Sequence, residues 1–180
     1  GVIITSTDAC LGTLEPARLA KVDAQGVQTA GDRASKTLAL HQRIYAADPE
    51  ARCVIHTHAT HVVALTLAGV WSPHDVVPPI TPYFVMKVGH VPLIPYHRPG
   101  DAAVPELVDK AITAMQQAGK PIRAVVLDRL GPVVWHRSAA EASAVLEELE
   151  ETARLWMLAR PKPLAADQIA ALVQHFGARW

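Results

Sequence analysis

The sequence has few cysteines, no long apolar run and no net charge. Two cysteines, Cys10 and Cys53, are too few for a disulfide framework, so a reducing cytoplasm is the predicted compartment. No stretch approaches the ~20 apolar residues that span a bilayer, and the start of the chain lacks a basic-then-apolar signal pattern. A formal net charge of zero gives no support for binding to nucleic acid or to an anionic membrane surface.

The remaining composition is typical of an ordinary globular protein. Of the 180 residues, 50% are hydrophobic and 19% are charged. This length fits one domain, covering residues 1–180, that buries a proper core. No repeat, low-complexity tract or linker divides the chain.

The alternation of strand and helix patterns predicts an α/β sandwich with a mixed or antiparallel central sheet. Apolar, β-branched runs predict strands, and helical spacing of apolar residues predicts helices. The predicted strands cover residues 2–5, 18–22, 27–29, 52–58, 91–96, 124–127 and 133–135. The predicted helices cover residues 35–47, 62–69, 101–119, 138–158 and 165–176.

Local signals mark the ends of several of these elements. Asp101 is a plausible N-cap, and residues 138–141 read Ser-Ala-Ala-Glu, which is a capping box. Gly131-Pro132 is expected to separate the last two strands. The proline-rich stretch 71–81 is expected to form a loop that wraps the functional site.

Three histidines within six residues form the densest group of chemically active side chains. His56, His58 and His61 follow the apolar run Cys53-Val54-Ile55. Because strand side chains alternate between faces, His56 and His58 should project on the same side and could share one divalent metal ion. The alternative is that one histidine packs in the core while the others lie on the surface.

A second polar segment, Tyr96-His97-Arg98-Pro99-Gly100-Asp101, leads into a predicted helix. Free backbone N–H groups at a helix N-terminus suit an anionic ligand, and the Arg98 guanidinium can form bidentate hydrogen bonds with a carboxylate or phosphate. Lys36, Thr37 and His41 could approach the histidines from the preceding helix, although the spacing of His41 favours a packed structural role. The alternative for Arg98 is a solvated loop side chain.

Taken in order along the chain, these motifs resemble the class II aldolase/adducin family. They are a Cys-Leu-Gly segment, Ser-Lys followed by Leu-His-x-x-x-Tyr, Val-Ile-His-x-His-x-x-His, Tyr-x-Arg-Pro-Gly-Asp, Leu-Gly-Pro-Val-Val and Glu-Glu-Leu-Glu-Glu-Thr-Ala. Within the family, the pattern is most similar to the 3-oxo-tetronate 4-phosphate decarboxylases. The resemblance runs through residues 3–177, nearly the whole chain.

The resemblance implies a compact α/β fold, a homotetramer with active sites between subunits, and a small anionic substrate of the sugar-acid or sugar-phosphate type. It also implies a divalent metal cofactor, zinc first, held by three histidines. In the family the metal stabilises an enediolate formed when a carbon–carbon bond breaks. Carried over residue by residue, His56 and His58 match the first two metal ligands.

Other positions depart from the family pattern. The turn that should supply the third histidine reads Arg129-Leu130-Gly131-Pro132, and leucine cannot coordinate a metal. Thr37 occupies the position of the catalytic glutamate, and a hydroxyl cannot act as a carboxylate base near neutral pH. The phosphate-binding loop reads Thr5-Ser6-Thr7-Asp8, with Asp8 in place of a glycine. The family's N-terminal phosphate-binding segment is also absent ahead of Gly1.

Two hypotheses follow. In the first, the chain is a metal-dependent carbon–carbon lyase, a decarboxylase or an aldolase, whose third ligand is replaced by His61, His97, His136 or a carboxylate. Thr7, Ser35, Lys36 and Arg98 then bind the substrate, and the catalytic candidates are Thr37, Tyr83 and Tyr96. In the second, the fold survives as a non-catalytic subunit or interaction protein.

Overall fold

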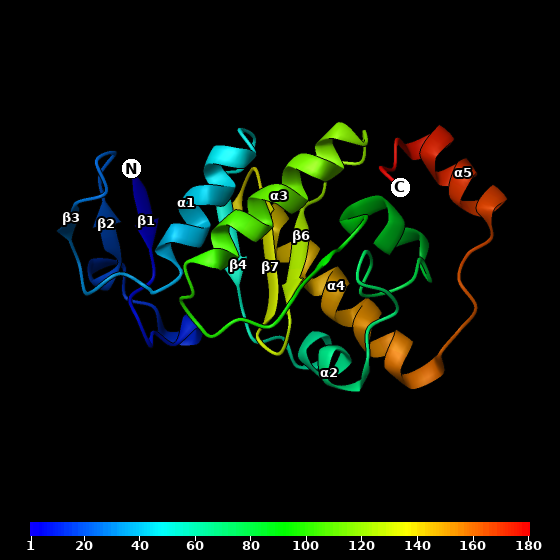
Figure 1. The fold of residues 1–180 in the computed structure, drawn as a ribbon, viewed down its shortest axis with the longest axis horizontal. Helices are drawn as coiled ribbons and strands as arrows, with labels where there is room; N and C mark the ends of the chain where they lie inside the picture. The colour runs from blue at the N-terminus through cyan, green and yellow to red at the C-terminus, as the bar shows by residue number, and fades with distance from the viewer.

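Two sheets of unequal size organise the chain in a computed structural model that describes all of residues 1–180 (Figure 1). The smaller sheet is antiparallel, has the order β1-β2-β3, and lies at one end of the molecule. Its strands are β1 (Val2–Ile4), β2 (Ala20–Val22) and β3 (Gln28–Ala30). The larger sheet has the order β4-β7-β6-β5, and its strands are β4 (Cys53–His56), β5 (Leu93–Ile94), β6 (Ala124–Leu127) and β7 (Gly131–His136).

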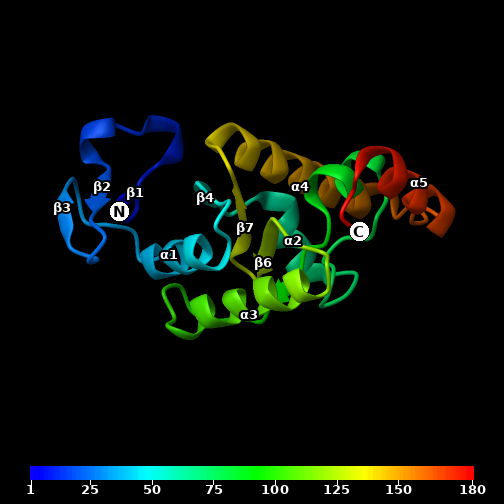
Figure 2. The ribbon, with the colours of Figure 1, turned by 90° about the horizontal axis from the view of Figure 1, so that it is seen from above.

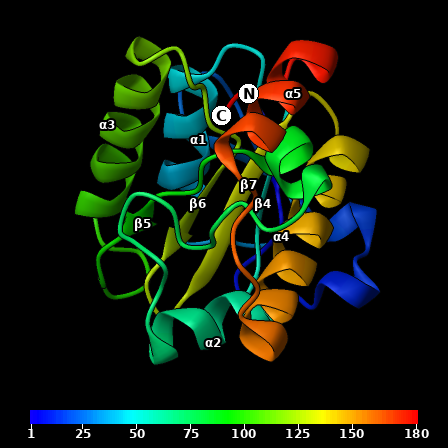
Figure 3. The same ribbon diagram turned by 90° about the vertical axis from the view of Figure 1, so that its right-hand side faces the viewer.

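Helices cover both faces of the larger sheet. α1 (Leu38–Ala47) and α3 (Ala103–Gln117) pack together on one face. The other face carries α2 (Thr60–Ala68), α4 (Ala139–Ala159) and the π-helical turn η3 (Phe84–Val88), and α5 (Ala166–Phe176) packs on η3. Figure 2 and Figure 3 show the strands between these two helical layers. The 3-10 turns η1 (Leu11–Thr13) and η2 (Pro16–Arg18) lie near the smaller sheet.

The core consists of two clusters, one on each face of the larger sheet. Along β6, Val125 and Leu127 belong to the cluster under α1 and α3, whereas Ala124 and Val126 belong to the cluster under α2 and α4. This is the two-residue alternation of strand side chains. Because β5 is parallel to β6 and the other pairs are antiparallel, the predicted sandwich with a mixed sheet is confirmed.

Several predicted strand boundaries are wrong, and the strand expected over residues 91–96 covers only Leu93–Ile94. The strand expected over residues 52–58 ends at His56. Gly131-Pro132 was expected to break a strand but lies within β7, and the chain turns at residues 128–130. The Pro132 carbonyl accepts from the Thr57 N–H, so this residue's backbone polar groups are directed toward β4. Thr57 lies just beyond His56, the last β4 residue paired with β7. The N–H that proline lacks is therefore not needed for the pairing, and Pro132 is tolerated there.

The helices agree more closely with expectation. The capping box is confirmed, because Ser138 Oγ accepts a hydrogen bond from the Glu141 N–H at 3.2 Å and donates to the Glu141 carboxylate. α1 begins at Leu38 and α3 at Ala103, slightly later than predicted. Ala102, not Asp101, is the N-cap of α3, although Asp101 Oδ1 accepts from the Ala103 N–H at 3.0 Å.

The proline-rich loop 71–81 does not wrap the histidines as expected. Its Val76 and Val77 are buried in the cluster under α2 and α4. Val54 belongs to the opposite cluster, and His56, two residues later on the same strand, therefore faces α1. No helix of the structure combines the length and hydrophobicity needed to cross a membrane.

Candidate functional site

The two histidines of the His-x-His motif lie beside each other where β4 ends. Their ring centroids are 5.6 Å apart, with the ring planes at 72°. His56 Nδ1 lies 2.9 Å from the carbonyl oxygen of Pro132. Because a carbonyl can only accept, Nδ1 carries the proton and Nε2 keeps a free lone pair. Metal-binding histidines use this arrangement, in which one ring nitrogen is anchored and the other binds the ion.

Burial keeps His56 in its neutral form. It lowers the pKa of His56, and the neighbouring His58 acts in the same direction, while the hydrogen bond to Pro132 opposes both. A neutral imidazole is the form that binds a metal ion. His58, by contrast, is exposed to solvent.

The turn between β6 and β7 lies directly against the histidine pair. Gly131 has φ +114°, and a Cβ at this position would collide with the carbonyl oxygen of Thr57 and crowd His58. The preceding residue, Leu130, packs against the core cluster under α1 and α3. The turn that adjoins His58 therefore carries an aliphatic residue, packed on the core, at the position where the family resemblance implies a metal ligand.

The structure offers no replacement for the third ligand. No group of three His, Cys, Asp or Glu side chains lies close enough together to hold a metal ion. His61 Nδ1 is 2.8 Å from Glu150 of α4, and His97 lies near Asp101. His136 pairs with Cys53, at the opposite end of the β4–β7 ladder from His56. The donors present therefore do not complete a three-ligand metal site.

His41 lies near His56, as its place on the helix that precedes the histidine strand predicts. It is only 9% exposed, its Nε2 has no hydrogen-bond partner, and burial together with the nearby His56 lowers the pKa of His41 to about 4. The predicted packing role agrees with this burial. How closely His41 approaches His56 depends on how α1 crosses β4, which no spacing in the sequence reveals.

His41 also locates the first turn of α1. Its N–H donates to the Thr37 carbonyl, so Thr37 lies one helical turn closer to the N-terminus than His41. Thr37 Oγ1 is 2.9 Å from Ser35 Oγ. The hydroxyl groups of Ser35 and Thr37 thus sit together at the start of a helix that passes His56.

The predicted phosphate loop lies alongside Ser35. The Ser35 N–H donates to the Thr5 carbonyl, and the Thr7 N–H donates to the Arg33 carbonyl, at 3.1 and 3.0 Å. Asp8 adopts φ 60°, a left-handed conformation that glycine takes without strain. Thr7 and Asp8 line a pocket of about 230 Å³ that also contains the Glu15 carboxylate. These carboxylates oppose phosphate binding in this pocket.

The two cations predicted to bind substrate come from segments that pack together. Gly100 has φ +78°, and a Cβ on it would lie 3.5 Å from the Cβ of Lys36. The Arg98–Gly100 turn is therefore next to the segment that begins α1. Arg98 itself is exposed, and its Nε is 3.5 Å from Asp101.

The two candidate tyrosines occupy different parts of the molecule. Tyr96 lies two residues after the end of β5 and two residues before Arg98, and is 58% exposed. Tyr83 precedes η3, on the face of the sheet covered by α4, and is 63% exposed. Within one chain, Tyr83 and His56 therefore lie on opposite faces of the sheet.

Comparisons with known proteins support the predicted family. Residues 1–157 match the family described as the class II aldolase and adducin N-terminal domain. The chain is 54% identical to a 3-oxo-tetronate 4-phosphate decarboxylase of Cupriavidus necator, over 100% of this chain and 83% of that protein. It is 40% identical to a protein of the same name from Escherichia coli (strain K12), over 95% of this chain and 79% of that protein.

A solved structure agrees with these relatives. YgbL of Escherichia coli, described as an aldolase, epimerase or decarboxylase, superposes with a TM-score of 0.80 at 40% identity, over 93% of this chain and 79% of that chain. These similarities support the prediction that the chain is a carbon–carbon lyase. The chain belongs to the class II aldolase and adducin family.

Proposed function

We propose that this protein is a lyase that decarboxylates a small 3-oxo sugar acid carrying a phosphate. The observation that carries the proposal is the 54% identity, along the whole chain, to a protein named for that reaction. The geometry supports it, because the His56–His58 pair, two cations and a cluster of hydroxyl groups lie around one end of the larger sheet. The cytoplasm is the compartment that we predict.

The chemistry of a 3-oxo acid explains how the reaction can proceed with Thr37 at the base position. The bond between the carboxylate and its neighbouring carbon breaks, and its electron pair moves toward the 3-oxo carbonyl. Carbon dioxide leaves, and the enolate that remains takes up a proton on carbon. No proton has to be removed from the substrate first, so a carboxylate base is not required.

We assign the chain's own residues to binding and to proton delivery. Lys36 and Arg98 bind the anionic groups of the substrate, since guanidinium and ammonium groups form strong charge-assisted hydrogen bonds with them. Ser35 and Thr37 donate further hydrogen bonds from the segment that leads into α1, and Thr7 donates from the loop after β1. Tyr96 is positioned on the same segment as Arg98 to return the proton.

Tyr83 requires a second subunit to take part. Its exposure, on the sheet face opposite His56, suits a residue that completes the site of a neighbouring chain. We therefore propose a homo-oligomer, a tetramer as the family resemblance implies, with sites between subunits.

His56 and His58 are the residues that would hold a divalent ion, zinc by preference. Such an ion supplies a Lewis acid that polarises a carbonyl oxygen. A catalytic zinc site ordinarily has three protein ligands and one open position. With only two imidazoles at this site, we expect weak metal binding.

Measurement of CO₂ release from 3-oxo-tetronate 4-phosphate, together with metal content, tests the proposal. We expect turnover by the native protein and at least a tenfold lower kcat/KM for His56→Ala and for Arg98→Gln, in line with the loss of a metal ligand or of a charged contact. Arg154→Gln removes an exposed arginine of α4 and is the matched control. Absence of turnover in the native protein, or full activity in His56→Ala, would overturn the proposal.

The second candidate is a non-catalytic subunit or interaction protein of the same fold. The apolar packing of Leu130 beside the histidines is the observation that favours it. It predicts metal-free protein, no turnover, and a melting temperature that chelators leave unchanged.

A further inference from the structure

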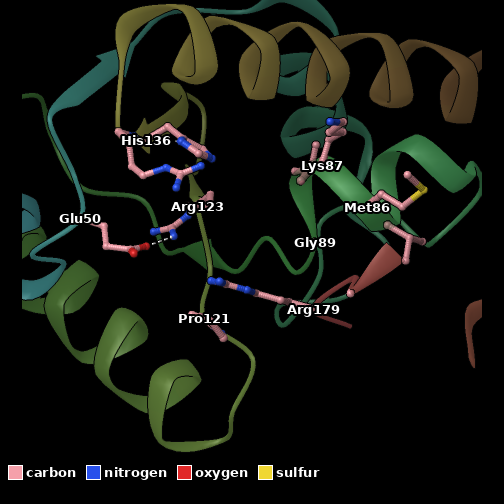
Figure 4. Close-up of a pocket in the computed structure, with 12 residues that line it drawn as sticks. Glu50, Met86, Lys87, Gly89, Pro121, Arg123, His136 and Arg179 are labelled. Atoms are coloured by element: carbon pink, nitrogen blue, oxygen red, sulfur yellow. Dashed lines mark hydrogen bonds and ion pairs between the residues drawn. The ribbon is translucent and has the colours of Figure 1, made fainter. Parts of the chain in front are cut away.

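A second pocket lies at the end of the larger sheet opposite the histidine pair (Figure 4). Its volume is about 170 Å³, which is room for roughly six water molecules. Glu50 and Arg123 come from the segments ahead of β4 and β6, and His136 ends β7. Residues of η3 and the C-terminal Arg179 close the other side.

Arg123 lines the pocket, but its charge is neutralised by two carboxylates. Arg123 pairs with the buried carboxylate of Asp48, and its other nitrogen is 2.7 Å from Glu50. Glu50 is thus held by Arg123, as the dashed line in Figure 4 shows. The only carboxylate lining the pocket is therefore already engaged by a cation.

The remaining cations of the pocket keep donors available. Lys87 and Arg179 both line it, and neither forms an ion pair with a carboxylate. Arg137 pairs only with Glu141, at 3.1 Å, and its side chain is exposed. Such a surface pair is weak and leaves the guanidinium free to turn toward a ligand.

His136 adds a directed N–H group. The backbone N–H of Arg137 donates to His136 Nδ1 at 2.9 Å, so in the neutral ring the proton lies on Nε2. The imidazole is thus a donor at its outer nitrogen, next to the arginines.

We propose that this pocket is a second anion site, which binds a small phosphate monoester or inorganic phosphate. Arg179 and Arg137 present planar guanidinium groups that match phosphate oxygens, and His136 adds an imidazole N–H donor to the lining. Lys87 contributes positive charge at the rim. The site uses none of the residues assigned to decarboxylation, so the two proposals are tested independently.

Titration of the protein with inorganic phosphate, followed through the ¹H–¹⁵N resonances of the histidine rings, tests the site directly. We expect the His136 resonances to shift with saturating behaviour, and the affinity to fall as salt screens the charges. The double variant Arg137→Gln/Arg179→Gln should weaken this binding at least tenfold, because two charge-assisted contacts are lost. Thermal unfolding checks that the variant is folded.

Two controls separate this site from its alternatives. Arg154→Gln removes an arginine from a similar exposed pair on α4, outside the pocket, and should leave the titration unchanged. Arg98→Gln should leave the His136 response unchanged even if it abolishes decarboxylation. The proposal is overturned if phosphate leaves His136 unshifted, if Arg154→Gln weakens binding as much as the double variant, or if Arg98→Gln removes the response.

Discussion

The two ends of the larger sheet differ in whether their buried polar groups have hydrogen-bond partners. At one end, Asp48 is 6% exposed and accepts hydrogen bonds from both Arg123 and Trp135 Nε1, the latter at 3.0 Å. At the other end, the buried His41 Nε2 has no hydrogen-bond partner, and the turn that lies against Thr57 and His58 carries Leu130. Buried groups that satisfy one another stabilise the fold, whereas buried groups left unsatisfied mark a place for a ligand or for chemistry.

Removal of Asp48 should have the largest effect on stability, because the buried Asp48 carboxylate neutralises the Arg123 guanidinium. Asp48→Ala leaves the Arg123 guanidinium without its buried partner and Trp135 Nε1 without its acceptor. We expect a loss of about 3–5 kcal/mol in the free energy of unfolding, measured in urea. Glu50→Gln, at the exposed partner of the same arginine, should cost less than about 1 kcal/mol. Equal losses in the two variants would show that burial does not distinguish them.

Low pH should reduce the free energy of unfolding through His41, which is buried near the His56–His58 pair. The pKa of His41 is lowered to about 4 in the folded state, against an ordinary value of 6.5, so the unfolded chain binds the proton more tightly. The stability that His41 contributes is therefore complete above pH 6.5 and is lost as the pH falls toward 4. The shift corresponds to about 3 kcal/mol over this window.

Urea unfolding between pH 7 and pH 4 measures this loss. We expect His41→Gln to have a flatter stability profile over this range, whatever its stability at pH 7. His61→Gln, which removes a half-exposed histidine paired with Glu150, is the control. An unchanged slope in His41→Gln would show that another group causes the acid sensitivity.

Replacement of Leu130 by histidine should complete a three-histidine metal site with His56 and His58. Leu130→His places a third imidazole in the turn that lies against Thr57 and His58. We expect zinc to bind at least tenfold more tightly, which is about 1.4 kcal/mol, as measured by competition with a chelating dye. Leu130→Met is the control, since it conserves the apolar volume. If Leu130→His binds zinc no better than the native chain, the Leu130 side chain does not face the histidine pair.

Elements defined by local signals were predicted well. The Ser138–Glu141 capping box and the hairpin between β2 and β3 are formed within a few residues of chain, where side-chain chemistry acts on the adjacent backbone. The His-x-His pair was also found from local alternation, although the strand ends at His56. The position of Pro132 inside β7 was missed because it depends on where the neighbouring strand stops.

The sequence alone determined the layered α/β fold, the family, and the residues on which the proposed chemistry depends, because periodicity and motifs are properties of short stretches of chain. Only the tertiary structure decided which distant residues meet. It brought His41 to His56, the Gly100 turn to Lys36, and Arg123 to Asp48. It also grouped Arg137, His136 and Arg179 around one pocket. These contacts join segments far apart in the chain, and their geometry is set by the packing of helices on both faces of the sheet.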